Sequence, residues 1–165
     1  MLDPSDAAGV SFFVGQQESA MSIFSKLFGG RPAKREKGAS SDDIPKLISQ
    51  LQQSAQDGNF VVFIFVPSDS KDDEPVNLQY SMDGGVVGFD WVLIGPRNIA
   101  DKMRIIDYAL SLGYRLEERN ENGCRFLRTT GSGISELGAG IIQEVYKIDR
   151  NTKLEIVTEG FEWQP

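Results

Sequence analysis

The chain has 165 residues, 40% of them hydrophobic and 25% charged, which is typical of a single globular domain with a substantial core and a tail. Its formal net charge is −7. General nucleic-acid binding is therefore not expected, because phosphate contacts require clustered Lys and Arg.

The residue types that the chain lacks exclude most conventional catalytic chemistry. It contains no histidine, which removes the commonest general base, the commonest metal ligand and any Ser-His or Cys-His pair. Cys124 is the only cysteine, so an intrachain disulfide and a CxxC zinc site are both excluded. We therefore predict no catalytic residue, no metal site and no cofactor.

Residues 1–40 are predicted to be a disordered tail and linker, and residues 41–165 a single domain. Met21 opens an apolar, acid-free stretch, and we interpret it as the true initiator. Apolar residues in 21–28 followed by a basic run to residue 37 are compatible with weak contact to a membrane surface. The favoured alternative is a tail whose apolar residues dock loosely or not at all.

No apolar run approaches the ~20 residues needed to cross a bilayer, so no transmembrane segment is predicted. The extreme N-terminus carries Asp3 and Asp6 where a signal peptide requires positive charge. A cytoplasmic protein is expected.

The first half of the domain is predicted to contain one helix and three strands. Residues 42–56 have apolar residues at helical spacing, and 60–66 form a continuous apolar run typical of a buried strand. An acidic loop at 68–75 separates this strand from 76–82, which alternates apolar and polar residues. Asp83-Gly84-Gly85 predicts a hairpin to the most apolar strand, 86–94.

The second half is predicted to contain two helices, a hairpin and a last strand. Asn98 is the expected N-cap of a helix ending at Gly113, with a core-facing stripe of Ile99, Met103, Ile106 and Leu110. Residues 114–119 and 124–129 are expected to pair around a four-residue loop, which places Leu116 opposite Leu127 and Glu118 opposite Arg125. A helix at 134–148 follows, with a stripe of Ile134, Leu137, Ile141, Val145 and Ile148, and then a strand at 153–158.

These elements predict an α+β fold with an antiparallel-rich sheet and its helices on one face. The order from residue 86 to about 160 is strand, helix, two strands, helix, strand, which is the ferredoxin-like βαββαβ arrangement. The N-terminal helix and the first two strands would extend this core.

From Asp90 onward the chain resembles the regulator of ribonuclease activity B family. The resemblance is carried by the helix leading into Gly113-Tyr114-Arg115-Leu116, the hairpin, the next helix and the ending Glu159-Gly160-Phe161-Glu162-Trp163. It implies a non-catalytic, protein-binding role. From residue 42 the element order is also similar to small acidic secretion chaperones, which bind proteins as well.

The candidate ligand- or partner-binding residues are Asp90, Arg97, Arg125, Arg128, Ser132 and Trp163. Asp90 is the one carboxylate in an apolar strand, where a charge is costly unless it is paired or hydrated. It either forms a polar pocket with Arg97, joined by Arg125 or Arg128, or has a structural role facing solvent or pairing with a neighbouring Arg.

Two further features complete the set of candidates. The loop Thr129-Thr130-Gly131-Ser132-Gly133 precedes a helix and resembles an anion nest, although a flexible connection is the favoured interpretation. Trp163 belongs either to the core or to a partner interface.

The leading hypothesis is a non-enzymatic regulator or chaperone that binds another protein, or a second copy of itself, through a sheet face or its acidic loop. The alternative is an enzyme or small-ligand sensor built from Asp90, Arg97 and the 129–133 loop.

Overall fold

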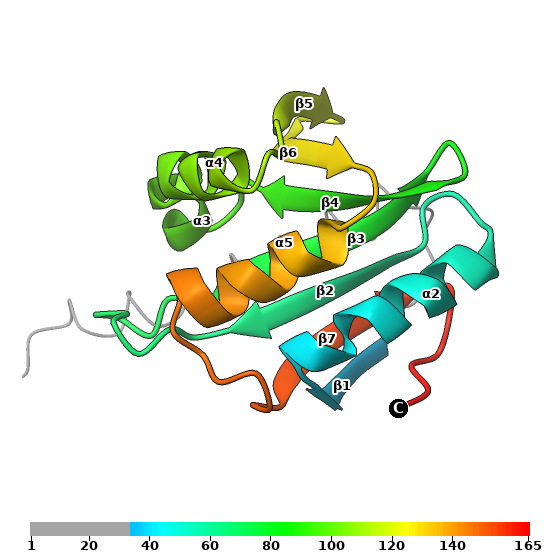
Figure 1. The fold of residues 1–165 in the computed structure, drawn as a ribbon, viewed down its shortest axis with the longest axis horizontal. Helices are drawn as coiled ribbons and strands as arrows, with labels where there is room; N and C mark the ends of the chain where they lie inside the picture. Colours follow the sequence, from blue (N-terminus) through cyan, green and yellow to red (C-terminus); the bar gives the residue numbers. More distant parts are fainter. Residues whose placement is uncertain (1–33) are drawn as a thin grey trace, which may run out of the picture.

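The computed structural model describes residues 34–165, which form one antiparallel sheet of seven strands with four helices (Figure 1). The α+β prediction is confirmed. The strands, in sheet order, are β1 (Lys34–Ala39), β7 (Leu154–Glu159), β2 (Phe60–Phe65), β3 (Val76–Asp83), β4 (Val86–Val92), β6 (Cys124–Thr130) and β5 (Glu117–Glu121). The helices are α2 (Ile44–Ser54), α3 (Pro96–Ala100), α4 (Lys102–Ser111) and α5 (Ile134–Gly140).

The strand order does not confirm the ferredoxin-like topology. As that topology requires, β6 lies between β4 and β5. However, β2 and β3 separate β7 from β4, which would be neighbours in a ferredoxin-like sheet. The reason is the tight Gly84-Gly85 turn, which places β3 on the edge of β4 where β7 would pair. The last strand pairs with β2 instead.

The predicted linker extends less far than expected, because Lys34–Ala39 form β1 at the edge of the sheet. This strand pairs antiparallel with β7, from Lys34 opposite Thr158 to Ala39 opposite Leu154. An edge strand is held by backbone hydrogen bonds on one side only and tolerates a charged sequence such as this one. The predictions for residues 1–33, including the start at Met21 and the membrane contact, lie outside the described residues.

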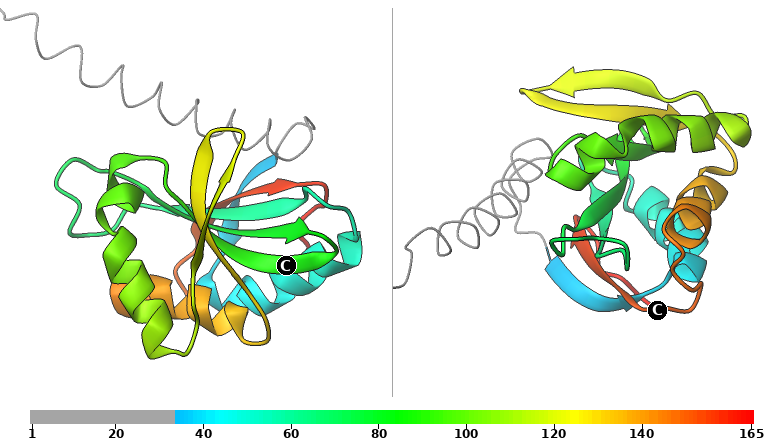
Figure 2. Two further views of the ribbon diagram at one scale, coloured as in Figure 1. Left: turned by 90° about the horizontal axis from the view of Figure 1, so that it is seen from above. Right: turned by 90° about the vertical axis from the view of Figure 1, so that its left-hand side faces the viewer.

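The inner face of the sheet, which we define as the face covered by α2 and α5, holds the main core (Figures 1 and 2). Alternate residues of the central strands point into it, among them Phe63, Tyr80, Phe89 and Trp91. The predicted helical stripe of residues 134–148 is confirmed, since Ile134, Leu137, Ile141 and Val145 are all buried. The α-helix itself ends at Gly140, and Ile141–Val145 continue it as a π-helix.

The opposite, outer face carries a second, smaller apolar cluster. Its buried members are Phe60, Val62, Val92, Cys124, Phe126 and Val157, and the partly buried Ile64 and Ile94 pack against them. All of the buried members come from strands, and none comes from a described helix.

Only Ile106 of the predicted core-facing stripe after β4 packs against the core; the other three residues of the stripe are exposed. Ile99, Met103 and Leu110 are 57%, 61% and 54% exposed, whereas Ile105 and Ala109 are fully buried. The predicted N-cap Asn98 lies inside α3 and is buried; it donates hydrogen bonds from its side-chain amide to the carbonyls of Val92 and Asn77, both at 2.9 Å. These tertiary bonds fix the orientation of α3, and the helix is interrupted at Asp101 before α4 begins.

The hairpin β5–β6 also differs from its prediction. Its turn consists of Asn122 and Gly123 alone, with φ of 50° and 82°. Two consecutive positive φ values are typical of the two-residue turns that Asn-Gly favours. The register is therefore shifted by two residues, so that Glu118 lies opposite Leu127 and Asn120 opposite Arg125.

In the described part of the chain, no helix has the length and apolar character needed to cross a membrane.

Candidate functional site

Asp90 is held in a buried polar cluster on the outer face. It lies opposite Gln79 on β3 and opposite Arg128 on β6. The Arg128 guanidinium donates to the Asp90 carboxylate at 2.7 Å, the Gln79 amide donates at 3.2 Å, and the Ser81 hydroxyl donates as well. Asp90 and Arg128 are 1% and 5% exposed. All hydrogen-bond partners of the carboxylate are residues of the neighbouring strands β3 and β6. Asp90 therefore has the structural role that the sequence offered as one of its two interpretations.

Competing effects act on the Asp90 carboxyl. Burial raises its pKa, whereas the charge of Arg128 and the hydrogen bonds from Ser81 and Gln79 favour the ionised form. Gly88 provides the space for this arrangement, because a Cβ at that position would lie 2.4 Å from the guanidinium carbon of Arg128. Arg128 thus lies directly over the β4 backbone and shields the carboxylate.

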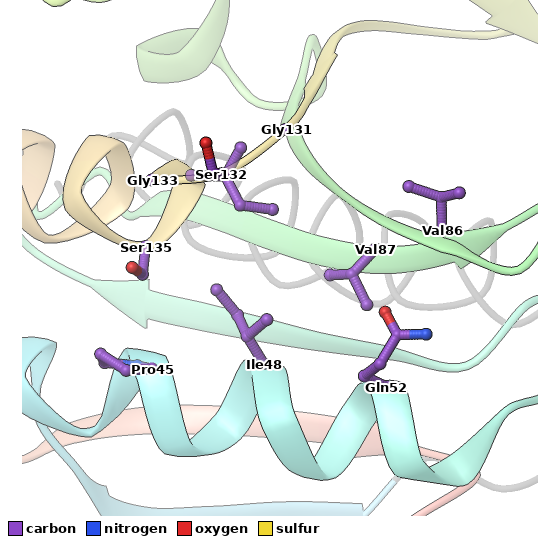
Figure 3. Close-up of a pocket in the computed structure, with 10 residues that line it drawn as sticks. Pro45, Ile48, Gln52, Val86, Val87, Gly131, Ser132, Gly133 and Ser135 are labelled. Carbon is purple, nitrogen blue, oxygen red and sulfur yellow. The ribbon is translucent and has the colours of Figure 1, made fainter.

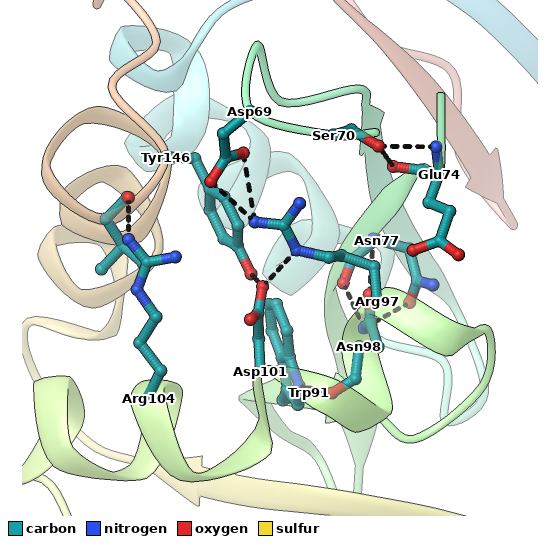
Figure 4. A network of polar contacts seen from close by, with 11 residues as sticks. Asp69, Ser70, Glu74, Asn77, Trp91, Arg97, Asn98, Asp101, Arg104 and Tyr146 are labelled. Carbon is teal, nitrogen blue, oxygen red and sulfur yellow. Dashed lines mark hydrogen bonds and ion pairs between the residues drawn. The ribbon is translucent and has the colours of Figure 1, made fainter. Parts of the chain in front are cut away.

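Arg97 belongs to a different network, at the end of the sheet where β4 leads into α3 (Figure 4). Its guanidinium donates to both carboxylate oxygens of Asp69 at 3.1 Å and to Asp101 at 2.7 Å. The same Asp101 oxygen accepts a hydrogen bond from the Tyr146 hydroxyl at 2.7 Å. Both hydrogen-bonded neighbours of Arg97 are acidic, so the predicted Asp90–Arg97 pocket does not form.

Tyr146 is the centre of this network and was not singled out from the sequence. Its ring stacks on Trp91 with centroids 6.4 Å apart, and the guanidinium groups of Arg97 and Arg104 lie 5.6 and 5.5 Å from its centroid. Burial and the hydrogen bond to Asp101 raise the pKa of its hydroxyl. The network links the acidic loop at Asp69 to the start of α4 and to the end of the π-helix Ile141–Val145. Within it, Asp69 and Asp101 accept the hydrogen bonds that Arg97 and Tyr146 donate.

Ser132 lines a shallow groove of about 380 Å³ between α2 and the loop before α5 (Figure 3). The groove walls are mainly apolar, with Pro45, Ile48, Val87 and Ile134 supplying much of the surface. Ser132 also accepts a hydrogen bond through its backbone carbonyl from the Tyr114 hydroxyl, at 2.6 Å. The predicted loop is shorter than expected, because Thr129 and Thr130 belong to β6; its remaining residues, 131–133, line this groove on the helix side, whereas Asp90 lies on the opposite face.

The remaining candidates lie apart from these sites. Arg125 is exposed on β6 and pairs with Glu118 across the hairpin. Trp163 is 7% exposed and belongs to the inner core, with Lys46 of α2 positioned 5.6 Å from its ring centroid. Of the six candidate residues, the structure brings only Asp90 and Arg128 together.

The clearest unexplained surface feature is an apolar strip formed by α3, α4 and the residue that follows α4. We define it as Ile99, Met103, Leu110 and Leu112, whose exposed fractions are 57%, 61%, 54% and 46%. Three of these residues were predicted to face the core. The packing of Asn98, Ile105 and Ala109 turns these three residues outward, whereas Ile106 of the same predicted stripe packs against the core.

Comparisons with known proteins give no further assignment: no family model, curated protein or solved structure matches this sequence. Within residues 34–165, no group of three or more Cys, Asp or Glu side chains could hold a metal ion.

Proposed function

We propose that this protein is a non-catalytic domain that binds another protein, and that the apolar strip on α3 and α4 is the contact. The observation that carries the proposal is the exposure of Ile99 on α3, of Met103 and Leu110 on α4, and of Leu112 directly after α4. Contiguous exposed apolar side chains mark interaction surfaces in soluble proteins.

The strip is well placed to bind without rearrangement of the fold. Ile105 and Ala109 anchor the other side of α4 in the core, and the Arg104 side chain donates to the Val145 carbonyl at 2.7 Å. A rigid helix face avoids much of the ordering cost of association. Completing the burial of side chains that are already half buried contributes on the order of 1 kcal/mol each. The resemblance to protein-binding families agrees with such a role.

The small-ligand alternative receives less support from the geometry. Asp90, Arg97 and the 129–133 loop would have to converge on one cavity, and they lie on the outer face, at the end of the sheet and on the helix side, respectively. The carboxylate of Asp90 already accepts from three side chains, and Arg97 is paired with two carboxylates.

The test compares two charge-matched double variants of the full chain. Met103→Lys/Leu110→Lys places two charges on the strip, and Gln53→Lys/Asn151→Lys adds the same charge at exposed polar positions elsewhere. Affinity purification from native lysate with quantitative mass spectrometry should recover a common partner with the wild type and the control. The strip variant should bind it roughly 30-fold more weakly, equivalent to about 2 kcal/mol.

Equal recovery with both variants, each with an unchanged melting temperature, would contradict the proposal. Light scattering after gel filtration determines whether the partner is a second copy. In that case the wild type and the control are dimers, and the strip variant is a monomer.

A further inference from the structure

Two residues of opposite charge, Arg104 and Asp107 of α4, lie beside the apolar strip. Both are exposed, and their spacing of three positions places them on the same side of the helix, next to Met103 and Leu110. Arg104 donates from one guanidinium nitrogen to the Val145 carbonyl, at 2.7 Å, and its other nitrogens remain available to a second acceptor. In the described part of the chain, the Asp107 carboxylate accepts no hydrogen bond and forms no ion pair. The strip is therefore bordered by one cation with spare donors and one carboxylate without a partner.

We propose that the partner of the apolar strip is a second copy of this chain, bound with the two α4 helices antiparallel across a two-fold axis. The inference rests on the proposed function, because it assigns an occupant to the same strip. Figures 1 and 2 show α3 and α4 at a margin of the described fold, beside the β5–β6 hairpin. A two-fold interface requires a surface that is complementary to itself, so that each contact occurs twice. The strip meets this requirement in its apolar residues and in its charges.

The spacing of the apolar residues fits a single two-fold axis near Ile106. In an antiparallel pair of helices, facing residues lie at similar distances on either side of the axis. An axis at this position places Met103 opposite the partner's Leu110, and Ile99 opposite the partner's Leu112. Packed helices have axes ~8–10 Å apart, which brings such side chains into contact. All four residues of the strip therefore contact apolar residues of the partner.

The same axis also pairs the charges. A two-fold axis that lies in the interface and crosses the helices brings together the matching flanks of the two helices, so Arg104 meets the flank that carries Asp107. The two residues would then lie within ~3 Å of each other along the helix direction, and symmetry would give two such ion pairs. A parallel arrangement would instead turn Arg104 toward the flank that carries Lys102, a like charge. Charge complementarity thus favours the antiparallel arrangement.

Charge-reversal variants of the full chain test this pairing. Arg104→Glu alone and Asp107→Lys alone each replace the two ion pairs with two contacts between like charges. An equimolar mixture of these two variants restores two pairs of opposite charge, and so does the double variant Arg104→Glu/Asp107→Lys. Sedimentation equilibrium measures the dimer dissociation constant. We expect a dimer for the wild type, a dissociation constant raised roughly 30-fold for each single variant, and values within about threefold of the wild type for the mixture and the double variant.

The design contains its own controls. Arg104→Glu makes the net charge more negative and Asp107→Lys makes it less negative, so long-range repulsion would shift their dimerisation in opposite directions. Circular dichroism shows whether each variant is folded.

A second measurement does not depend on the Arg104–Val145 hydrogen bond. An equimolar mixture of Met103→Cys and Leu110→Cys chains is oxidised mildly, and the disulfide-linked dimers are identified by mass spectrometry. Both positions are exposed, whereas the native Cys124 is buried. We expect the mixed disulfide to exceed both symmetric ones, because only unlike positions face each other across the axis.

The possible failures of the two proposals are distinguishable. A wild type that stays monomeric at every concentration overturns this inference alone, since the strip is then tested by its binding of a different protein. Single variants that dimerise as strongly as the wild type, or symmetric disulfides that equal the mixed one, overturn the antiparallel pairing. A Met103→Lys/Leu110→Lys variant that still dimerises and still recovers every partner of the wild type contradicts the proposed function as well.

Discussion

The inner and outer faces of the sheet bury side chains of different character. On β3 and β4 the inner face presents Leu78, Tyr80, Phe89 and Trp91, whereas the outer face of the same strands presents Gln79, Ser81 and Asp90. The Tyr80 hydroxyl is a buried polar group of the inner core and donates to the Ile134 carbonyl at 2.7 Å. The outer face instead contains an ion pair with its own hydrogen-bond network. Apolar packing stabilises the inner face, whereas the Asp90–Arg128 ion pair and its hydrogen bonds stabilise the centre of the outer face.

Each face also contains a glycine whose missing side chain accommodates a polar group. A Cβ at Gly138 of α5 would lie 1.9 Å from the Tyr80 hydroxyl, and a Cβ at Gly88 would lie within 3 Å of three guanidinium atoms of Arg128. A glycine therefore makes room for the neutral Tyr80 hydroxyl on one face and for the charged Arg128 guanidinium on the other. Mutations at these positions test whether the two faces differ as their chemistry suggests.

The largest expected effect is on the outer face. Asp90→Ala should lower the free energy of unfolding by about 3–5 kcal/mol, because it leaves the Arg128 guanidinium buried without its counter-charge. The measurement is urea denaturation followed by circular dichroism. The double variant Asp90→Leu/Arg128→Met removes both charges and should cost less than Asp90→Ala alone. A loss below about 1 kcal/mol for Asp90→Ala would show that the pair contributes little to stability.

On the inner face, Gly138→Ala should cost about 2 kcal/mol, because the new methyl group overlaps the Tyr80 hydroxyl. The ring is enclosed in the core and cannot move away. In a Tyr80→Phe background, where the overlapping oxygen is absent, the additional cost of Gly138→Ala should be clearly smaller. Equal costs in both backgrounds, measured by the same denaturation assay, would place the strain elsewhere.

The corresponding change on the outer face, Gly88→Ala, is expected to cost about 1–2 kcal/mol. The Arg128 side chain is more flexible than a tyrosine ring, but moving it would break its hydrogen bonds to Asp90 and Ser81. A double-mutant cycle with Arg128→Ala provides the control, since the methyl group should be tolerated once the guanidinium is removed. Additivity of the two changes would contradict the proposed contact.

The smallest effect concerns the ion pair that holds the acidic loop, outside both faces. The hydrogen bond from Arg97 lowers the pKa of Asp69 below its ordinary value of 3.8. A carboxyl whose pKa is lower in the folded state than in the unfolded state stabilises the fold fully at a pH above its unfolded pKa. That stability is lost as the pH falls from the unfolded pKa through the folded pKa. Asp69→Asn should therefore lower the melting temperature slightly at pH 7 and have less effect near pH 3. The exposed Asp72→Asn is the control, and an undiminished difference at pH 3 would refute the assignment.

The sequence predicted local structure well where one signal dominated. The apolar run at 60–66, the Gly-Gly hairpin and the stripe of the third helix correspond to β2, the β3–β4 turn and the buried side of α5 and its π-helical extension. Asp90 was identified as the residue that packing could not explain, and pairing with a neighbouring Arg was among its interpretations. The identity of that partner depended on the register of β4 and β6, which places Arg128 opposite Asp90.

The two main failures have different causes: distant contacts decided the orientation of the helix after β4, and a local turn signal was overlooked in the hairpin. In the predicted stripe, Ile99, Met103 and Leu110 face outward and only Ile106 packs against the core, because Asn98 bonds to the carbonyls of Asn77 and Val92 and thereby fixes the orientation of α3. The Asn122-Gly123 signal was present in the sequence and was missed, which shifted the predicted register of the hairpin.

The sequence by itself determined that this is an α+β domain without histidine chemistry, and it located nearly every helix and strand, because periodicity and turn residues act locally. Only the tertiary structure decided the position of β7 beside β2, the outward direction of the apolar strip and the partner of Asp90. These properties depend on contacts between residues far apart in the chain, so they cannot be predicted from any single stretch of the sequence.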